Sequence, residues 1–511
     1  MKALWAAAIL MLAAAPAAAE IRQADTTAGT VAGEVRDGLS MFKGIPFAAP
    51  PVGHNRWRAP QPPIPWVGVR KTTEFAPACM QGEQLARQMG SQAPLSEDCL
   101  YIDVWSPAAA ATDKLPVIAW IYGGGFNSGM SSVPLYDGAN FAKQGVVFVS
   151  INYRVGPFGF LATPELSAEG DGSGNYGLLD QIKGLEWVRD NIAAFGGDPG
   201  NVTIMGHSAG AMAVSNLVAS PLARGLFHKA IAESGATFTP PQSEPWAGGN
   251  IHTLALAERS GSAWLRSLGA ATLAQARAVP AKSVEEAQRA AGAPSFRPVM
   301  DGRVLPGDQF LLWQQGRYAD VPVLTGATSA EWGSGPITSA ALSERLQRDY
   351  GSLAPAFAAV YRARNDEEAR AAATRLGTDS FVWNNYTWAK LQAERRGSPV
   401  YAYWFHRPTE QNPLGSPHGA EVAFVFGNED ARRTAWTEAD RNLSRQLQAY
   451  WVNFARTGNP NGQSLPQWPQ FIPGRPTVLQ VGAETKPIAV PGADRLAVFD
   501  RYFASRRAAA Q

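Results

Sequence analysis

From about residue 100 onward, short apolar runs alternate with longer segments whose apolar positions recur every three or four residues. The run 145–152 is apolar almost throughout, which is typical of a strand buried on both faces. Segment 177–192 has the spacing that places apolar side chains on one face of a helix. The same patterns predict strands at 100–105, 115–121, 201–205, 228–232 and 321–325, and a helix at 209–219.

The later part of the chain is expected to be mainly helical. Segments 255–290 and 340–395 are rich in Ala, Arg and Glu, and the last long helix is predicted over Glu438–Arg456, before a Gly-Asn-Pro sequence. Strands buried on both faces that alternate with helices indicate an α/β fold with a mostly parallel sheet. No linker-like segment divides the chain, so residues 20–511 are expected to form one domain.

The N-terminus has the pattern of a secretory signal peptide. Lys2 is followed by the apolar run 3–15, and Pro16 with the alanines 17–19 supplies a small-residue cleavage site before Glu20. The apolar run is too short to span a membrane. We therefore expect removal of residues 1–19 and export of the mature chain, with a buried N-terminal helix as the alternative.

Charge and composition exclude some classes of partner. The 511 residues include 45 basic and 43 acidic side chains, a formal net charge of +2. A balance so close to neutral provides no field for attracting nucleic acid or an anionic membrane surface. With 45% apolar residues, the chain can bury a large core.

Cys79 and Cys99 are the only cysteines. In an exported protein such a pair usually forms a disulfide, which here would close a loop of about 20 residues. Two separate thiols are the alternative. No cluster of Cys and His accompanies the pair, which argues against a metal site.

Ser208 lies in Gly206-His207-Ser208-Ala209-Gly210, a G-x-S-x-G sequence. A strand is predicted directly before it and a helix directly after it, as in the strained strand-to-helix turn that exposes a nucleophilic serine. Ser208 is therefore the candidate nucleophile. A serine in an ordinary structural turn is the alternative.

A serine hydroxyl needs a base to take its proton, and histidine is the usual one. For serines on such turns the chain order is Ser, acid, His, which excludes His54 and His207. His418 lies in a Gly/Pro-rich loop from which a side chain can reach a cleft, and it is the preferred base. The other histidines are His228, in a strand-like run, and His252 and His406, which stay open as alternatives.

The third member is a carboxylate that holds the imidazole in the right tautomer. Glu331 follows the predicted strand 321–325 after a short loop, at the edge of the sheet where the sites of α/β proteins gather. Asp301, Asp308 and Asp320 are the rivals, each better explained by a turn or a helix cap.

Gly123, Gly124 and Gly125 follow the predicted strand 115–121, with Tyr122 in the first position of an HGGG-type loop. Glycines let backbone N–H groups converge on a developing oxyanion where a side chain would obstruct them. The N–H of Ala209 would complete this set of donors.

These residues resemble the type-B carboxylesterases, a family that includes cholinesterases and bacterial para-nitrobenzyl esterases. The resemblance runs from about Gly29 to Arg501 and is carried by seven segments: Phe42–Phe47, Glu97–Tyr101, Tyr122–Phe126, Asn152–Arg154, Phe195–Pro199, Gly206–Gly210 and His418–Glu421. It implies an α/β-hydrolase fold with helical insertions over the active site. It also implies hydrolysis of small carboxylic esters without a metal or organic cofactor.

The resemblance assigns roles to individual residues. The implied catalytic triad consists of Ser208, Glu331 and His418. The implied oxyanion donors are Gly124, Gly125 and Ala209. The implied structural features are a Cys79–Cys99 disulfide, a Glu97–Arg154 salt bridge, Ser234 near the triad acid and Phe126 beside the pocket.

The chain departs from the family pattern in three places. His207 stands where the family usually has Glu, and no Trp lies between Cys79 and Cys99 to provide a face for a choline cation. Both differences argue against cholinesterase activity. Trp332 follows the candidate acid where Gly is common, which is expected to narrow the cleft. His207 is interpreted as a structural histidine, with tuning of the site as the alternative.

One substrate clue comes from the segment before residue 296. Cholinesterases place bulky aromatic residues there, which shorten the acyl pocket, whereas Gly292 and Pro294 fall near those positions here. The resemblance therefore suggests a roomier acyl pocket, with Arg297 close enough to favour an acidic acyl group.

The sequence thus predicts an exported serine carboxylesterase that works through an acyl-enzyme on Ser208. A non-catalytic esterase-like binding protein is the alternative outside enzymes. A lipase or an amidase is the alternative within them, although no apolar lid segment typical of a lipase is apparent.

Overall fold

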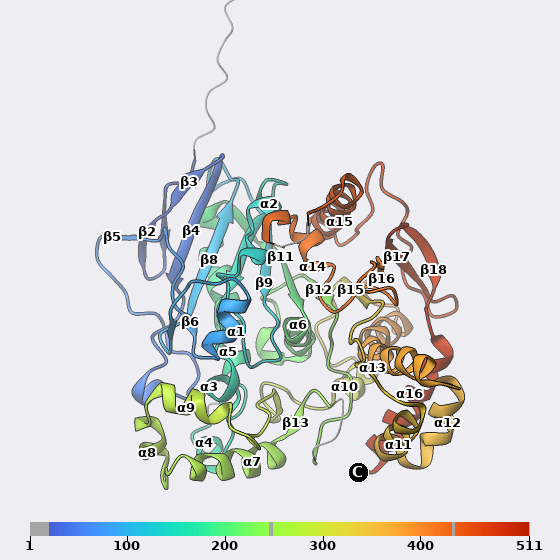
Figure 1. Ribbon diagram of the computed structural model, residues 1–511. Helices are drawn as coiled ribbons and strands as arrows, with labels where there is room; N and C mark the ends of the chain where they lie inside the picture. Colours follow the sequence, from blue (N-terminus) through green and yellow to red (C-terminus); the bar gives the residue numbers. More distant parts are fainter. Residues whose placement is uncertain (1–19, 171, 245–248, 432–434, 510–511) are drawn as a thin grey trace, which may run out of the picture.

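The computed structural model describes residues 20–170, 172–244, 249–431 and 435–509, so the predicted signal peptide lies outside the described residues. A long, twisted sheet runs through the middle of the described part, with helices on both sides (Figure 1). Its strands are β3 (Glu34–Arg36), β4 (Leu39–Pro46), β8 (Tyr101–Ser106), β9 (Leu115–Ile121), β10 (Val147–Ile151), β11 (Gly197–His207), β12 (Lys229–Glu233), β15 (Val323–Thr328), β16 (Val400–His406), β17 (Thr477–Gly482) and β18 (Lys486–Ala489).

The strand order is β18-β17-β16-β15-β12-β11-β9-β10-β8-β4-β3. From β10 to β17 neighbouring strands are parallel, while β8, β4 and β3 on one edge and β18 on the other add antiparallel pairs. This is the α/β-hydrolase architecture that the sequence predicts. The remaining strands form small sheets: β1 (Gln23–Thr26), β2 (Gly29–Ala32) and β5 (Val69–Lys71); β6 (Ala78–Cys79) and β7 (Leu95–Ser96); β13 (His252–Thr253) and β14 (Val299–Met300).

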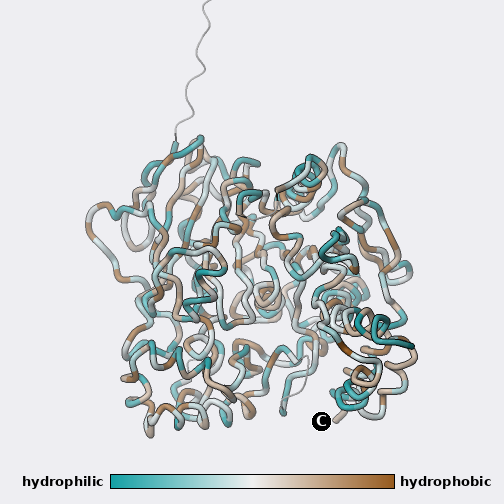
Figure 2. Tube along the Cα trace, in the orientation of Figure 1, coloured by the Kyte–Doolittle hydropathy of each residue, from teal (hydrophilic) through white to brown (hydrophobic). Residues whose placement is uncertain are grey.

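The helices that cover the sheet form two layers. The α-helices are α1 (Glu83–Gln88), α2 (Ala139–Ala142), α3 (Gly156–Phe160), α4 (Pro164–Ala168), α5 (Tyr176–Asn191), α6 (Ala209–Ala219), α7 (Leu254–Ser267), α8 (Leu273–Ala278), α9 (Ala281–Gln288), α10 (Gln309–Gln315), α11 (Ser339–Tyr350), α12 (Ala354–Val360), α13 (Asp366–Glu394), α14 (Val422–Phe426), α15 (Glu438–Thr457) and α16 (Ala493–Ala509). Helices α5, α6 and α13 pack on one face of the sheet, and α2 and α15 pack on the other. Along α7–α9, brown and teal alternate in Figure 2, as expected for helices with one buried side.

Most predicted elements are confirmed with shifted ends. The helix 209–219 is α6, and 177–192 is α5 displaced by one residue. The helix predicted over Glu438–Arg456 is confirmed as α15, but it is not the last long helix, because α16 follows it and buries Leu496, Phe499 and Phe503. Among the described helices, none is both long and apolar enough to cross a membrane.

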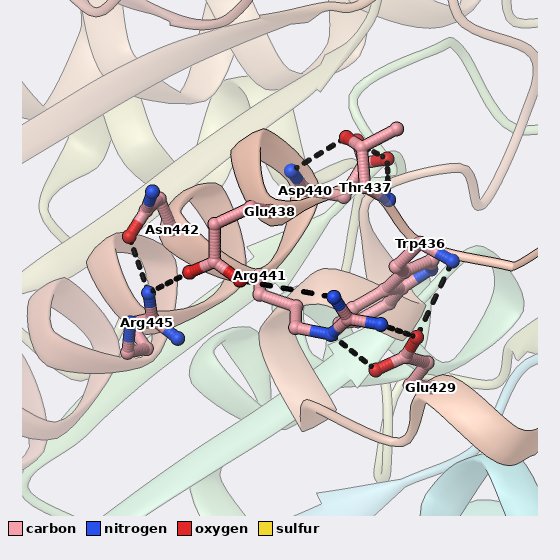
Figure 3. Close-up of polar contacts among 8 residues, drawn as sticks. All are labelled: Glu429, Trp436, Thr437, Glu438, Asp440, Arg441, Asn442 and Arg445. Carbon is pink, nitrogen blue, oxygen red and sulfur yellow. Dashed lines mark hydrogen bonds and ion pairs between the residues drawn. The ribbon is translucent and has the colours of Figure 1, made fainter.

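The start of α15 shows why this helix begins at the predicted residue. Thr437 accepts a hydrogen bond from the Asp440 N–H, and the Asp440 carboxylate accepts one from the Thr437 N–H, a capping box (Figure 3). Arg441, on the next part of the helix, donates to Glu429. The cap satisfies N–H groups that the first turn of a helix leaves without partners.

Of two contacts expected in the N-terminal part of the chain, the disulfide is confirmed and the predicted salt bridge is wrong. Cys79 and Cys99 form a disulfide. The expected Glu97–Arg154 salt bridge is absent, because Glu97 receives two hydrogen bonds of 2.6 Å from Arg56. Arg154 instead donates to both oxygens of the buried Asp180, at 2.8 and 2.7 Å.

Candidate active site

Ser208 occupies the sharp turn between β11 and α6. Its φ of 59° and ψ of −124° lie where residues other than glycine are strained. The turn closes because Gly206 and Gly210 lack side chains: a Cβ on Gly210 would lie 2.0 Å from the Ile121 carbonyl oxygen. The Ser208 N–H donates to the Glu233 carbonyl at 2.9 Å, which fixes the turn against β12.

Glu331 and His418 come from the loops that follow β15 and β16, two neighbouring parallel strands. These loops are joined by backbone hydrogen bonds, including one of 3.2 Å from the His418 N–H to the Glu331 carbonyl. His418 Nε2 lies 2.8 Å from Ser208 Oγ, and His418 Nδ1 forms a short hydrogen bond with Glu331 Oε2. The other Glu331 oxygen accepts the Thr328 N–H at 2.7 Å. The structure therefore brings the three residues selected from the sequence into one hydrogen-bonded series.

The environment of His418 favours its protonated form. Burial lowers the pKa of the imidazole, but the charge and hydrogen bond of Glu331 and the charge of Glu421 together outweigh burial. The net effect is a raised pKa. A base whose cation is stabilised in this way is suited to accept a proton from a hydroxyl and later return it.

Three rings fix the orientation of His418. Trp332 stacks on it with ring centroids 4.5 Å apart, and Phe381, from α13, meets it edge to face at 5.3 Å. His207 lies on another side, with its ring centroid 4.6 Å away. Trp332 is 48% exposed, so it covers the imidazole from the solvent side. His207 is buried, and its ring fills the space beside Gly419, where a Cβ would lie 3.0 Å from His207 Cε1.

The glycine loop after β9 lies against the turn that holds Ser208. A Cβ on Gly123 would lie 2.5 Å from the His207 carbonyl oxygen and 2.9 Å from Ser208 Cβ, so only glycine fits there. Gly124 and Gly125 have φ of +122° and +63°. Within the described ranges, neither of their N–H groups donates to a protein acceptor. Phe126 is buried below this loop and packs against Phe160.

Behind the series lies a cluster of buried carboxyl groups that the sequence analysis missed. Ser234 does not bond to Glu331 but donates to Glu421 at 2.9 Å, and Tyr403 donates to the same oxygen at 3.1 Å. Burial, and then the charge of Glu331, raise the pKa of Glu421 to about 7. Burial, and then the charge of Glu421, also raise the pKa of Glu233 well above its ordinary value, and the Glu233 carboxyl accepts a hydrogen bond from the Trp451 indole N–H. The feature of the sequence that could have indicated this cluster is the position of Glu421, three residues after His418.

Replacing Glu421 with Gln should change how stability depends on pH. The folded-state pKa of about 7 exceeds the ordinary value of 4.5, so rising pH ionises this group first in the unfolded chain. The wild type should therefore lose stability relative to Glu421→Gln between pH 4.5 and 7, by up to about 3 kcal/mol. Urea unfolding of both proteins across this range measures the difference between their free energies of unfolding. A difference that did not change with pH would contradict the titration of Glu421 in the folded protein.

The rival residues have other roles. Asp308 caps α10 by accepting the Phe310 N–H, and Asp301 accepts the N–H groups of Arg303 and Leu305 in a turn. His228 Nδ1 accepts the Val202 N–H, and His406 Nδ1 lies 2.9 Å from Ser329 Oγ. In the described part of the chain, no group of three or more His, Cys, Asp or Glu residues is placed to hold a metal ion.

The strand order, the serine turn and the Glu331–His418–Ser208 series together define an α/β-hydrolase. Residues 20–497 match the model of the carboxylesterase family, and the chain belongs to that family. It is thus a carboxylic-ester hydrolase.

Two curated relatives and one solved structure show how similar this chain is to known esterases. The chain is 36% identical to "Fumonisin B1 esterase" of Sphingopyxis macrogoltabida over 464 residues, which covers 87% of this chain and 84% of that protein. It is 36% identical to "Para-nitrobenzyl esterase" of Bacillus subtilis (strain 168), over 87% of this chain and 92% of that protein. A solved PNB esterase aligns with a TM-score of 0.80 and 34% identity, over 94% of this chain and 99% of the other.

Proposed function

We propose that the protein is an exported serine carboxylesterase that cleaves esters through an acyl-enzyme on Ser208. The observation that carries this proposal is the series in which Glu331 holds His418 and His418 Nε2 lies 2.8 Å from Ser208 Oγ. Export is supported by the signal-peptide pattern of residues 1–19 and by the Cys79–Cys99 disulfide.

The reaction proceeds in two halves. Ser208 Oγ bonds to the ester carbonyl carbon while His418 Nε2 takes the hydroxyl proton, and the alcohol then leaves with that proton. Water attacks the acyl-enzyme in the same way, so the carboxylic acid is released and Ser208 regains its proton. Glu331 keeps the Nδ1 proton in place, which leaves Nε2 free to accept the proton from serine.

The tetrahedral intermediates carry a negative oxygen that needs hydrogen-bond donors. The N–H groups of Gly124, Gly125 and Ala209 are assigned this role, because the glycine loop lies against Ser208 and Ala209 begins α6. The first N–H groups of a helix have no partner within the helix, and its N-terminus favours negative charge. Each such donor is worth about 3 kcal/mol to the transition state.

A fluorophosphonate, which reacts with activated serines, tests the proposal directly. We expect one equivalent to be bound, with the added mass on the peptide that contains Ser208, and esterase activity to fall in proportion. Ser234, which is buried and donates to Glu421, should stay unlabelled. If Ser208 remained unlabelled while esters were still cleaved, another residue would be the nucleophile.

A further inference from the structure

Trp332 is exposed to solvent and yet fixed in position. It is 48% exposed, and across the described residues the other large apolar side chains that are exposed are aliphatic. The loop that carries it is anchored on α13, because the Ser334 N–H donates to Thr374 Oγ1 at 3.0 Å and Arg370 Nε donates to the Ser334 carbonyl at 3.3 Å. A Cβ on Gly377, also on α13, would lie 3.5 Å from Trp332 Cβ. The indole is therefore held in place although about half of it faces water.

The indole of Trp332 lies face to face with the imidazole of His418. The ring centroids are 4.5 Å apart and the ring planes differ by 26°, so one ring covers the other. Phe381, on α13, stands nearly at right angles to both rings, with its centroid 5.8 Å from the indole and 5.3 Å from the imidazole. On this side, His418 is thus in contact with aromatic rings that carry no charge.

The charged and titratable groups that face His418 come from other elements. Glu331, in the loop after β15, bonds to Nδ1, and Glu421, at the start of α14, adds negative charge. His207, at the end of β11, has its ring centroid 4.6 Å from that of His418. A hydrogen bond at a ring nitrogen lies in the plane of the ring, so the carboxylate of Glu331 leaves the face of the imidazole to Trp332.

The proposed reaction places a positive charge on this imidazole. When His418 Nε2 takes the proton of Ser208 Oγ, the ring becomes an imidazolium, whose charge is spread over all its atoms. A cation within about 6 Å of the centroid of an aromatic ring is attracted by the electrons on the ring face, most strongly by those of tryptophan. The stack of 4.5 Å meets this condition. It therefore stabilises the state after proton transfer more than the state before it.

We propose that Trp332 is a positioning residue, whose indole face holds and stabilises the protonated ring of His418 through a cation–π contact. The proposal rests on the proposed esterase function, in which His418 is the base. It gives Trp332 a role beyond the narrowing of the cleft that the sequence predicts. A side chain that only covered the ring would have the opposite effect on protonation, because burial disfavours the charged form.

Three replacements of Trp332 separate these two roles. Trp332→Leu and Trp332→Met keep an apolar cover without an aromatic face, whereas Trp332→Phe keeps a smaller face. NMR of protein labelled at its six histidines measures the pKa of His418 and follows His207 separately, with His418→Gln to assign the signal. We expect a lower pKa of His418 in Trp332→Leu and Trp332→Met, with an acid dissociation constant about threefold larger. Trp332→Phe should stay within about twofold of the wild-type constant.

Catalysis should change in the same order. In Trp332→Leu the acid limb of the pH profile of kcat/KM for para-nitrophenyl acetate should move to lower pH, and the plateau should fall about threefold. Because the side chain is half-exposed, all three variants should unfold close to the wild-type temperature.

A raised or unchanged pKa of His418 in Trp332→Leu and Trp332→Met would overturn the proposal, and so would a pKa equal to that in Trp332→Phe. The NMR titration does not depend on turnover. Failure of the wild type to hydrolyse the ester would therefore overturn the proposed function and not the contact between the two rings.

Discussion

Replacing Ser208 with alanine should lower kcat for para-nitrophenyl acetate by about 10⁴-fold or more, with little change in the thermal unfolding midpoint. The variant keeps the glycine loop and His418 but has no oxygen that can bond to the carbonyl carbon. Ser208→Ala removes only one atom, and the Ser208 N–H bond to Glu233 stays. Initial rates with purified protein, alongside thermal unfolding, measure both quantities.

Ser215→Ala is a suitable control for this experiment. Ser215 lies two turns further along α6 and donates to the Met212 carbonyl within the helix. Its loss should leave kcat near the wild-type value. Retention of wild-type turnover by Ser208→Ala would remove the proposed mechanism altogether.

Glu331→Gln should lower kcat by about 10⁴-fold, the effect that the same acid-to-amide change has in serine hydrolases of unrelated fold that use an equivalent triad. The Thr328 N–H donates to one carboxylate oxygen, so the amide oxygen of Gln would keep that position. The amide NH₂ group would then face His418 Nδ1 and act as a donor. His418 would carry its proton on Nε2, toward Ser208, where it cannot accept the serine proton.

The pH dependence of kcat/KM in Glu331→Gln distinguishes this explanation from a loss of folding. Glu421→Gln serves as the comparison, because it also changes a buried glutamate but one that bonds to Ser234 and Tyr403. Its loss of kcat should be clearly smaller. Equal losses in the two variants would show that Glu331 has no special relation to the imidazole.

Ser208 and Glu331 could be predicted from the sequence because each follows a strand that the apolar pattern indicates, and His418 because it lies in a Gly/Pro-rich loop later in the chain. Ser208 directly follows β11, Glu331 lies in the loop after β15 and His418 lies in the loop before α14, which is the order that the serine turn predicts. The disulfide could be predicted for a simpler reason, because the sequence contains only two cysteines.

Contacts between buried charges that lie far apart in the chain could not be predicted from the sequence in the same way. Glu97 was assigned to Arg154, but two other charged residues decide the pairing, and only the fold brings Arg56 to Glu97 and Asp180 to Arg154. Ser234 was expected near Glu331, yet its partner is Glu421, which lies 187 residues away along the chain. Helix α16 was missed because its buried residues depend on packing against α12 and α13.

The distance along the chain between the proposed nucleophile and its proposed base has a consequence for folding. Ser208 and His418 are separated by 210 residues, and the base is positioned only when β15 and β16 are paired and their loops are joined. Contacts between parts so far apart in sequence form slowly, because a large loop must close first. A chain that is still being synthesised displays its serine well before its imidazole, so the onset of hydrolysis reports that the C-terminal half of the sheet has assembled.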